Sequence, residues 1–177
     1  MTDQIKLQVK KESIMKRKLF ILCFCVFSIF LFNAFADEVE DKLAILKLVD
    51  QQFEAFNKHD AEAVALPAAE NYENWDYSVK NKAAKIQTIS RLFKEHPNIQ
   101  GKRIKYRIIF VTPDVAIYKD IAEFFNMVDK NGKTLPPDYE LWAGVWVKKN
   151  GKWVEVASFC KEIKKEDIEK SLNCSSD

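Results

Sequence analysis

The chain has 177 residues, with 28 lysines and arginines against 26 aspartates and glutamates. This near balance gives no basic surface of the kind that nucleic-acid-binding domains show, so we expect no nucleic-acid partner. Only four glycines occur in the whole chain, which excludes the glycine-rich loops that bind phosphate groups in nucleotide-binding domains.

Residues 1–36 are typical of a secretory signal peptide. A basic stretch that begins at Met15 precedes an apolar run over residues 19–32, and a small-x-small cleavage site ends at Ala36. A membrane anchor needs about 20 apolar residues, and this run is interrupted at Ser28. We therefore expect translation to start at Met15, cleavage after Ala36, and a secreted or periplasmic product with no membrane attachment.

Cleavage would remove six basic and two acidic groups, which leaves 22 basic and 24 acidic residues and a formal net charge of −2. The remaining 141 residues are the length of one domain. Two cysteines remain, Cys160 and Cys174. Export to an oxidising compartment favours a disulfide between them, and the alternative is two free thiols.

Helices come first in the predicted domain. Apolar residues recur every three or four positions over residues 38–58, which predicts a long amphipathic helix. Asp60 is suited to cap a short second helix that ends near Pro67. Residues 72–79 predict a first strand or extended segment, and residues 81–94 return to helical spacing.

Strands follow the helices. Residues 104–110 alternate between apolar and basic side chains, and residues 115–128 predict another long strand. The strongest signal lies at residues 141–159, where two strands are joined by Asn150 and Gly151, the residue pair that best tolerates a type I′ hairpin turn. The basic side chains of the first of these strands share one face, which we interpret as solvated: Arg103, Lys105 and Arg107.

The Asn-Gly turn predicts the register of the hairpin. Trp146 then lies opposite Glu155, and Trp142 lies opposite Phe159. Small aliphatic residues let helices approach closely, so we expect one face to point toward the helices: Leu141, Ala143, Val145, Val147, Val154, Val156 and Ser158. We expect the aromatic face to point away and to bind a protein partner or a second copy: Trp142, Trp146, Trp153 and Phe159.

This order of elements predicts an α+β fold. We expect a strongly curved antiparallel sheet with three N-terminal helices packed on its concave face. Residues 37–163 would form this domain, and residues 164–177 would form a C-terminal helix or tail.

Few side chains are candidates for chemistry. The two histidines are far apart and no close cysteine pair remains after cleavage, so we expect no metal site and no cofactor. The carboxylates Asp76, Asp120, Glu123 and Glu140 are the acid–base candidates. Asp76 stands out because it follows Trp75, and an apolar setting favours the protonated form of a carboxyl. An exposed loop aspartate is the alternative interpretation.

Residues 55–60 (AFNKHD) and 69–71 (AEN) resemble the opening of the nuclear-transport-factor-like superfamily, which includes ketosteroid isomerases and SnoaL-like polyketide cyclases. The segments TPDVAIYK and NGKWVEVASF resemble strands of small secreted members of the SgcJ/EcaC type. The similarity spans residues 40–160. It implies a cystatin-like, cone-shaped roll with a pocket between sheet and helices, and a homodimer through the outer face of the sheet.

The resemblance also implies site residues. Asp76 falls sixteen positions after Asp60, where the isomerases place their general base. Gln52 occupies the position of their enolate-stabilising tyrosine, and their second acid has no counterpart, with only Glu140 nearby. The isomerase set of catalytic groups is therefore incomplete in this chain.

Three functions fit the sequence. The first is binding of a small apolar or amphipathic ligand without catalysis. The alternative interpretation is that the predicted ligand-binding residues only form the hydrophobic core. The second is an isomerase or cyclase that transfers a proton, with Asp76 as base and Gln52 as carbonyl donor. The third is a protein-interaction module that uses the aromatic face of the hairpin. The predicted ligand-binding residues are Phe53, Phe56, Trp75, Tyr118, Val145, Val156 and Ser158.

Overall fold

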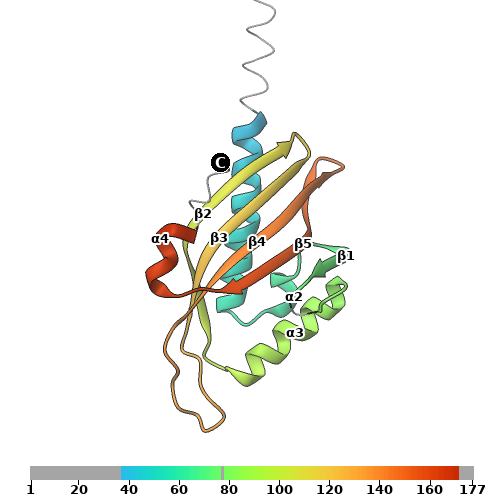
Figure 1. Cartoon of the computed structure of the whole chain (residues 1–177). Helices are drawn as coiled ribbons and strands as arrows, with labels where there is room; N and C mark the ends of the chain where they lie inside the picture. Colours follow the sequence, from blue (N-terminus) through green and yellow to red (C-terminus); the bar gives the residue numbers. More distant parts are fainter. Residues whose placement is uncertain (1–36, 77, 172–177) are drawn as a thin grey trace, which may run out of the picture. The chain divides into compact units, whose positions relative to one another are not determined.

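The computed structural model describes residues 37–76 and 78–171 (Figure 1). The chain divides into two compact units, Met1–Leu43 and Ala44–Asp177. Residues 37–43 of the first unit are helical, with an ion pair of 3.1 Å between Lys42 and Glu38. The expected signal peptide and Cys174 lie outside the described residues, so the predictions of cleavage and of a disulfide stay predictions.

The second unit has the α+β element order that the sequence predicts. Helical residues 44–57, here called the first helix, are followed by a short helix, a first strand and a longer helix, then by four long strands and a short helical end. The elements are α2 (Ala61–Val64), β1 (Ala68–Asn74), α3 (Lys82–Glu95), β2 (Gln100–Thr112), β3 (Val115–Phe125), β4 (Asp138–Lys149), β5 (Lys152–Glu162), the 3-10 helix η1 (Lys165–Asp167) and α4 (Ile168–Ser171).

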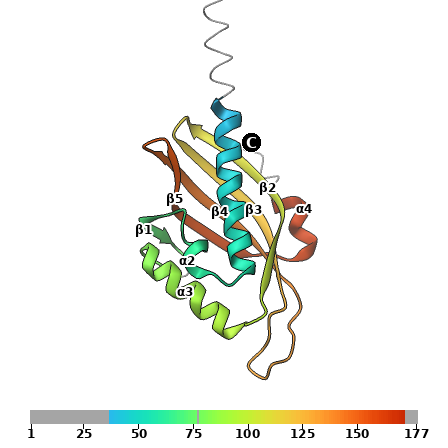
Figure 2. The same cartoon turned by 180° about the vertical axis from the view of Figure 1, so that it is seen from behind.

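The five strands form one sheet in the order β1-β5-β4-β3-β2. The long strands pair in antiparallel fashion, and β1 pairs with β5 in parallel. Figure 2 shows helical residues 44–57, α2 and α3 on one face of this curved, open sheet. The predicted fold class is confirmed. Among the described residues, no helix combines the length and the apolar character needed to cross a membrane.

Short polar side chains determine where the helices begin and how they join the sheet. Asp60 caps α2 by accepting a hydrogen bond of 3.0 Å from Ala63 N, as its sequence position predicts. Asn81 caps α3 in the same way. At the start of β2, the Asn57 amide donates to Gly101 O and its carbonyl oxygen accepts from Gly101 N, at 3.0 and 2.8 Å. The first helix and the sheet are thus joined directly.

The hairpin register is confirmed near the turn and wrong farther from it. Asn150 and Gly151 both have positive φ, and Trp146 pairs with Glu155 as predicted. A bulge at Val145 and Trp146 then adds one residue to β5, so that Trp142 lies opposite Cys160 and not Phe159. Each pair beyond the bulge is therefore shifted by one residue.

The predicted assignment of the two hairpin faces is wrong for β4 and for β5 up to the bulge, whereas beyond the bulge Ser158 lines the cavity and Phe159 is exposed, as predicted. Trp146 is only 1% exposed, and it packs with Trp153 against Ile45 and Val49 of the first helix. The large indoles therefore point toward the helices, and Val145, on the other side of the pleat, points away. The physical reason is that burying a large indole removes more apolar surface from water than burying a small aliphatic side chain does.

A second core cluster joins the helices to the far end of the sheet. The Phe56 ring lies 5.1 Å from the Phe93 ring of α3 and 5.3 Å from the Phe124 ring of β3, centroid to centroid. Edge-on contacts of this kind add to the stabilisation that apolar burial provides. Residues of both clusters line a cavity.

Candidate active site or ligand-binding site

A cavity of about 380 Å³ lies between the helices and the inner face of the sheet. Its volume falls in the range of small-molecule sites. Its apolar wall consists mainly of Val49, Phe53, Phe56, Val64, Ile89, Leu92, Phe124, Trp142 and Trp146. Polar side chains from the first helix and from β1, α3, β3, β4 and β5 also line it, including the acid–base candidate Glu140, and the buried ones form two groups.

The first polar group is centred on Asp120 of β3, which lines the cavity and is 3% exposed. The Tyr118 hydroxyl donates a hydrogen bond of 3.0 Å to Asp120 Oδ2. Arg103 Nη1 donates to the same tyrosine oxygen at 3.5 Å, and Arg103 Nη2 lies 2.7 Å from Asp50 Oδ1. A bulge after Arg103 turns this side chain inward, away from the basic stripe that strict alternation predicts.

Burial raises the pKa of Asp120 to about 7. The hydrogen bond from Tyr118 and the charge of Arg103 lower it again, and the charge of Glu155 raises it further. Burial and the charge of Asp120 raise the pKa of Tyr118, so this phenol remains protonated and can continue to donate. The cavity therefore contains a carboxyl whose protonation changes near neutral pH.

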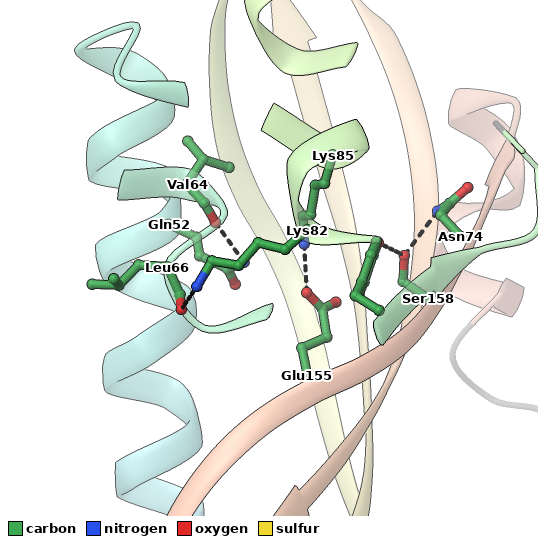
Figure 3. Close-up of polar contacts among 9 residues, drawn as sticks. Gln52, Val64, Leu66, Asn74, Lys82, Lys85, Glu155 and Ser158 are labelled. Carbon is green, nitrogen blue, oxygen red and sulfur yellow. Dashed lines mark hydrogen bonds and ion pairs between the residues drawn. The ribbon is translucent and has the colours of Figure 1, made fainter. Parts of the chain in front are cut away.

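The second polar group joins α3 to β5 (Figure 3). Lys85 Nζ lies 2.5 Å from Glu155 Oε2, and the two side chains are 13% and 10% exposed. The same ammonium lies 4.2 Å from the centre of the Tyr72 ring. Burial alone would lower the pKa of Lys85, but the charges and hydrogen bonds of Glu155 and Tyr72 together outweigh burial, and the pKa is raised. The cationic form of Lys85 is therefore favoured.

Ser158 completes this group. Asn74 Nδ2 donates a hydrogen bond of 2.8 Å to Ser158 Oγ, and the Tyr72 hydroxyl is hydrogen-bonded to the same oxygen. All three side chains are buried. Burial first, and then the charge of Glu155, raise the pKa of Tyr72. These residues form a neutral hydroxyl network beside the Lys85–Glu155 ion pair.

Some of the residues predicted from the sequence to bind a ligand line this cavity. Phe53, Phe56, Tyr118 and Ser158 do so, and so does Gln52, whose amide Nε2 donates to Val64 O at 3.0 Å.

The placement of Trp75, Val145 and Val156 in the pocket wall is wrong. None of them is among the residues that line the cavity, and Trp75 is 72% exposed.

The predicted arrangement around Asp76 is wrong as well. This aspartate is exposed and lies outside the cavity wall, and its Oδ2 accepts a hydrogen bond of 2.6 Å from Cys160 N. It cannot share a substrate in the cavity with Gln52. A carboxylate that caps a backbone N–H of β5 has a structural role.

The predicted aromatic surface does not exist as such. Trp146 and Trp153 are buried in the core, and Trp142 lines the cavity. Phe159 alone of the four is exposed on the other face of β5. The expected homodimer stays a prediction, but those indoles cannot form its interface.

Sequence reasoning missed most of the second polar group. Lys85, Glu155, Tyr72 and Asn74 come from three separate elements, and no local pattern connects them. Asp120 did have a signal, because it follows Ala116 and Tyr118 at every second position of a mostly apolar strand and therefore lies on the same face. Among the described residues, no group of three histidine, cysteine or acidic side chains could hold a metal ion.

The chain matches no protein-family profile and no curated protein. Solved structures do resemble it. An uncharacterised protein with a cystatin-like fold from Caulobacter vibrioides has a TM-score of 0.64 and 13% identity over 74% of this chain and 95% of its own. The chain has the cystatin-like fold. The fold prediction drawn from the resemblance to the nuclear-transport-factor-like superfamily is thereby confirmed.

Proteins named as enzymes share this cystatin-like fold. A putative scytalone dehydratase from Novosphingobium aromaticivorans has a TM-score of 0.63 and 14% identity, over 73% of this chain and 88% of its own. A hexachlorocyclohexane dehydrochlorinase, LinA-type3 from Novosphingobium barchaimii, has a TM-score of 0.65 and 11% identity, over 73% of this chain and 90% of its own. At such identities the likeness establishes the fold alone, and function has to be argued from the site.

The Lys85–Glu155 pair predicts a specific pattern of stabilities. Lys85→Met leaves Glu155 buried without its counter-charge and should lower the free energy of unfolding by about 3–5 kcal/mol. The double variant Lys85→Met, Glu155→Gln should be more stable than this single variant. Urea denaturation measures both variants and the single variant Glu155→Gln, with Lys94→Met on the exposed side of α3 as control. A double variant that is as unstable as the sum of the singles would contradict the pairing.

Asp120 predicts a pH dependence of stability. Its pKa is raised from 3.8 to about 7 on folding, so the folded state keeps a proton that the unfolded state releases. The contribution of Asp120 to stability is therefore present below about pH 4 and is lost as pH rises to about 7, up to about 4 kcal/mol in all. Asp120→Asn should remove this decline, and the exposed control Glu62→Gln should keep it. Parallel pH profiles for wild type and Asp120→Asn would disprove it.

Proposed function

We propose that this protein is an exported domain that binds a small, largely apolar molecule with a polar group in the cavity. The main support for this proposal is the cavity, which is lined mostly by apolar side chains and by two groups of buried polar side chains. Apolar walls supply the free energy of binding, and a few placed polar groups orient the ligand. Export is supported by the basic and apolar pattern of residues 1–36.

A blocked cavity tests ligand binding. Thr88 lies on α3 at the cavity wall, so Thr88→Trp should fill the space and weaken binding of the neutral dye N-phenyl-1-naphthylamine at least tenfold. Gln87→Trp adds the same bulk on the exposed side of the helix and should bind like the wild type. Dye fluorescence gives the affinities, and native mass spectrometry shows whether a molecule co-purifies. Equal effects of the two substitutions would contradict the proposal.

A second candidate function is proton transfer by Asp120. Two observations support this candidate. Asp120 is a buried carboxyl in the cavity with a pKa raised to about 7, and it accepts a hydrogen bond from the Tyr118 hydroxyl. A general base works best when its pKa lies near the working pH. Two proteins of the same fold are named as a dehydratase and a dehydrochlorinase, and both names denote eliminations, in which a substrate loses a proton.

Exchange of α-protons tests this candidate. In deuterated water, 2-tetralone should exchange the protons next to its carbonyl faster with the protein than without it, as measured by NMR. The rate should rise with pH and level off above about 7, because only the carboxylate form of Asp120 accepts a proton. Asp120→Asn should lower the rate by about 10²–10⁴-fold. Asp76→Asn should have no effect, and loss of exchange in this control alone would favour Asp76 instead.

A further inference from the structure

The inner face of the sheet has a gap at Gly144 of β4. Gly144 lies opposite Tyr118 of β3 on one side and Ser158 of β5 on the other. Directly opposed residues of antiparallel strands point to the same face, so Tyr118 and Ser158 flank a position without a side chain. The backbone of Gly144 is not in the left-handed region, so its conformation does not require glycine.

Two polar atoms converge on the space that a side chain at Gly144 would occupy. A Cβ atom there would lie 3.0 Å from Trp146 Nε1 and 3.1 Å from Glu155 Oε1. Trp146, Glu155 and Gly144 all line the cavity. A side chain at this position would crowd both atoms, so the glycine lets a donor and an acceptor lie close together at the cavity wall.

The donor is unsatisfied. Trp146 Nε1 is buried and has no hydrogen-bond partner among the described residues. A buried N–H without a partner loses its hydration and gains nothing in return, so each such group calls for an explanation. A ligand atom that accepts a hydrogen bond over Gly144 would supply the partner that the protein lacks.

The acceptor is held in place by the ion pair. Lys85 Nζ lies 2.5 Å from Glu155 Oε2 (Figure 3). Oε1 of the same carboxylate is the atom next to Gly144. A hydroxyl group both accepts and donates, so it can satisfy Trp146 and Glu155 together. A carbonyl oxygen would satisfy only the indole, and an ammonium group would satisfy only the carboxylate.

We infer that the space over Gly144 is a subsite for a ligand hydroxyl, which accepts a hydrogen bond from Trp146 Nε1 and donates one to Glu155 Oε1. The ligand is accordingly an alcohol or a phenol whose apolar body occupies the rest of the cavity. This inference rests on the proposed function of the cavity as a ligand site, and it adds the chemical class of the ligand.

A matched pair of compounds tests the subsite, namely 2-naphthol and 2-methylnaphthalene. They have the same rings and differ only in hydroxyl against methyl, so ring-current effects on protein signals cancel in the comparison. In the ¹⁵N-labelled protein, the indole N–H signal of Trp146 should move downfield with 2-naphthol relative to 2-methylnaphthalene. Trp146→Phe assigns that signal by its disappearance.

Two variants locate the effect. Gly144→Ala fills the space, and Trp146→Phe removes the donor while keeping an aromatic ring. Each should weaken binding of 2-naphthol about tenfold and leave 2-methylnaphthalene within about twofold. Trp75→Phe, on an exposed indole outside the cavity, should change neither affinity. Trp146→Phe keeps the test valid if Gly144→Ala does not fold.

The outcomes separate the inference from the proposed function. If neither compound binds to the wild type, the proposed ligand site itself fails. If both bind, the Trp146 signal does not respond to the hydroxyl and the variants affect both compounds equally, the cavity is a ligand site but the hydroxyl subsite is disproved. Selective loss of 2-naphthol in both variants supports the inference.

Discussion

The candidate site depends on one irregularity in the sheet, the bulge in the β4–β5 hairpin. Glu155 and Ser158 are three residues apart in β5, so in a regular strand their side chains would point to opposite faces. The extra residue that the bulge adds reverses the alternation between them, and both side chains reach the cavity. The Lys85–Glu155 salt bridge and the hydroxyl network of Tyr72 and Ser158 can therefore line the same cavity.

The bulge also explains which parts of the hairpin were predictable. The Asn150–Gly151 turn predicts the register as far as Trp146 and Glu155, because turn geometry determines the pairs nearest to it. No local residue pattern indicated that β5 would gain an extra residue directly after this pair. The choice of face was not predictable from the hairpin alone either, because small aliphatic residues on one face and indoles on the other are both suited to burial.

The order of elements was predictable because it depends on periodicity and on caps such as Asp60. The site was not, because its main ion pair joins residues 70 positions apart on a helix and a strand. The resemblance to the nuclear-transport-factor-like superfamily suggested Asp76 as the general base, because it lies sixteen positions after Asp60. Its carboxylate instead accepts a hydrogen bond from a backbone N–H of β5. Asp120 could be identified from the sequence only in part, as a carboxylate on the same strand face as Ala116 and Tyr118.

The Tyr118 hydroxyl connects the cavity with the protein surface. It donates to Asp120 inside and accepts from Arg103, whose partner Asp50 is mostly exposed on the first helix. The charge of Arg103 lowers the pKa of Asp120, so a change at Asp50 that repositions this guanidinium alters proton affinity within the cavity. The protonation of the buried carboxyl can thus be tuned by evolution or by design at a surface position, without any change in the shape of the cavity.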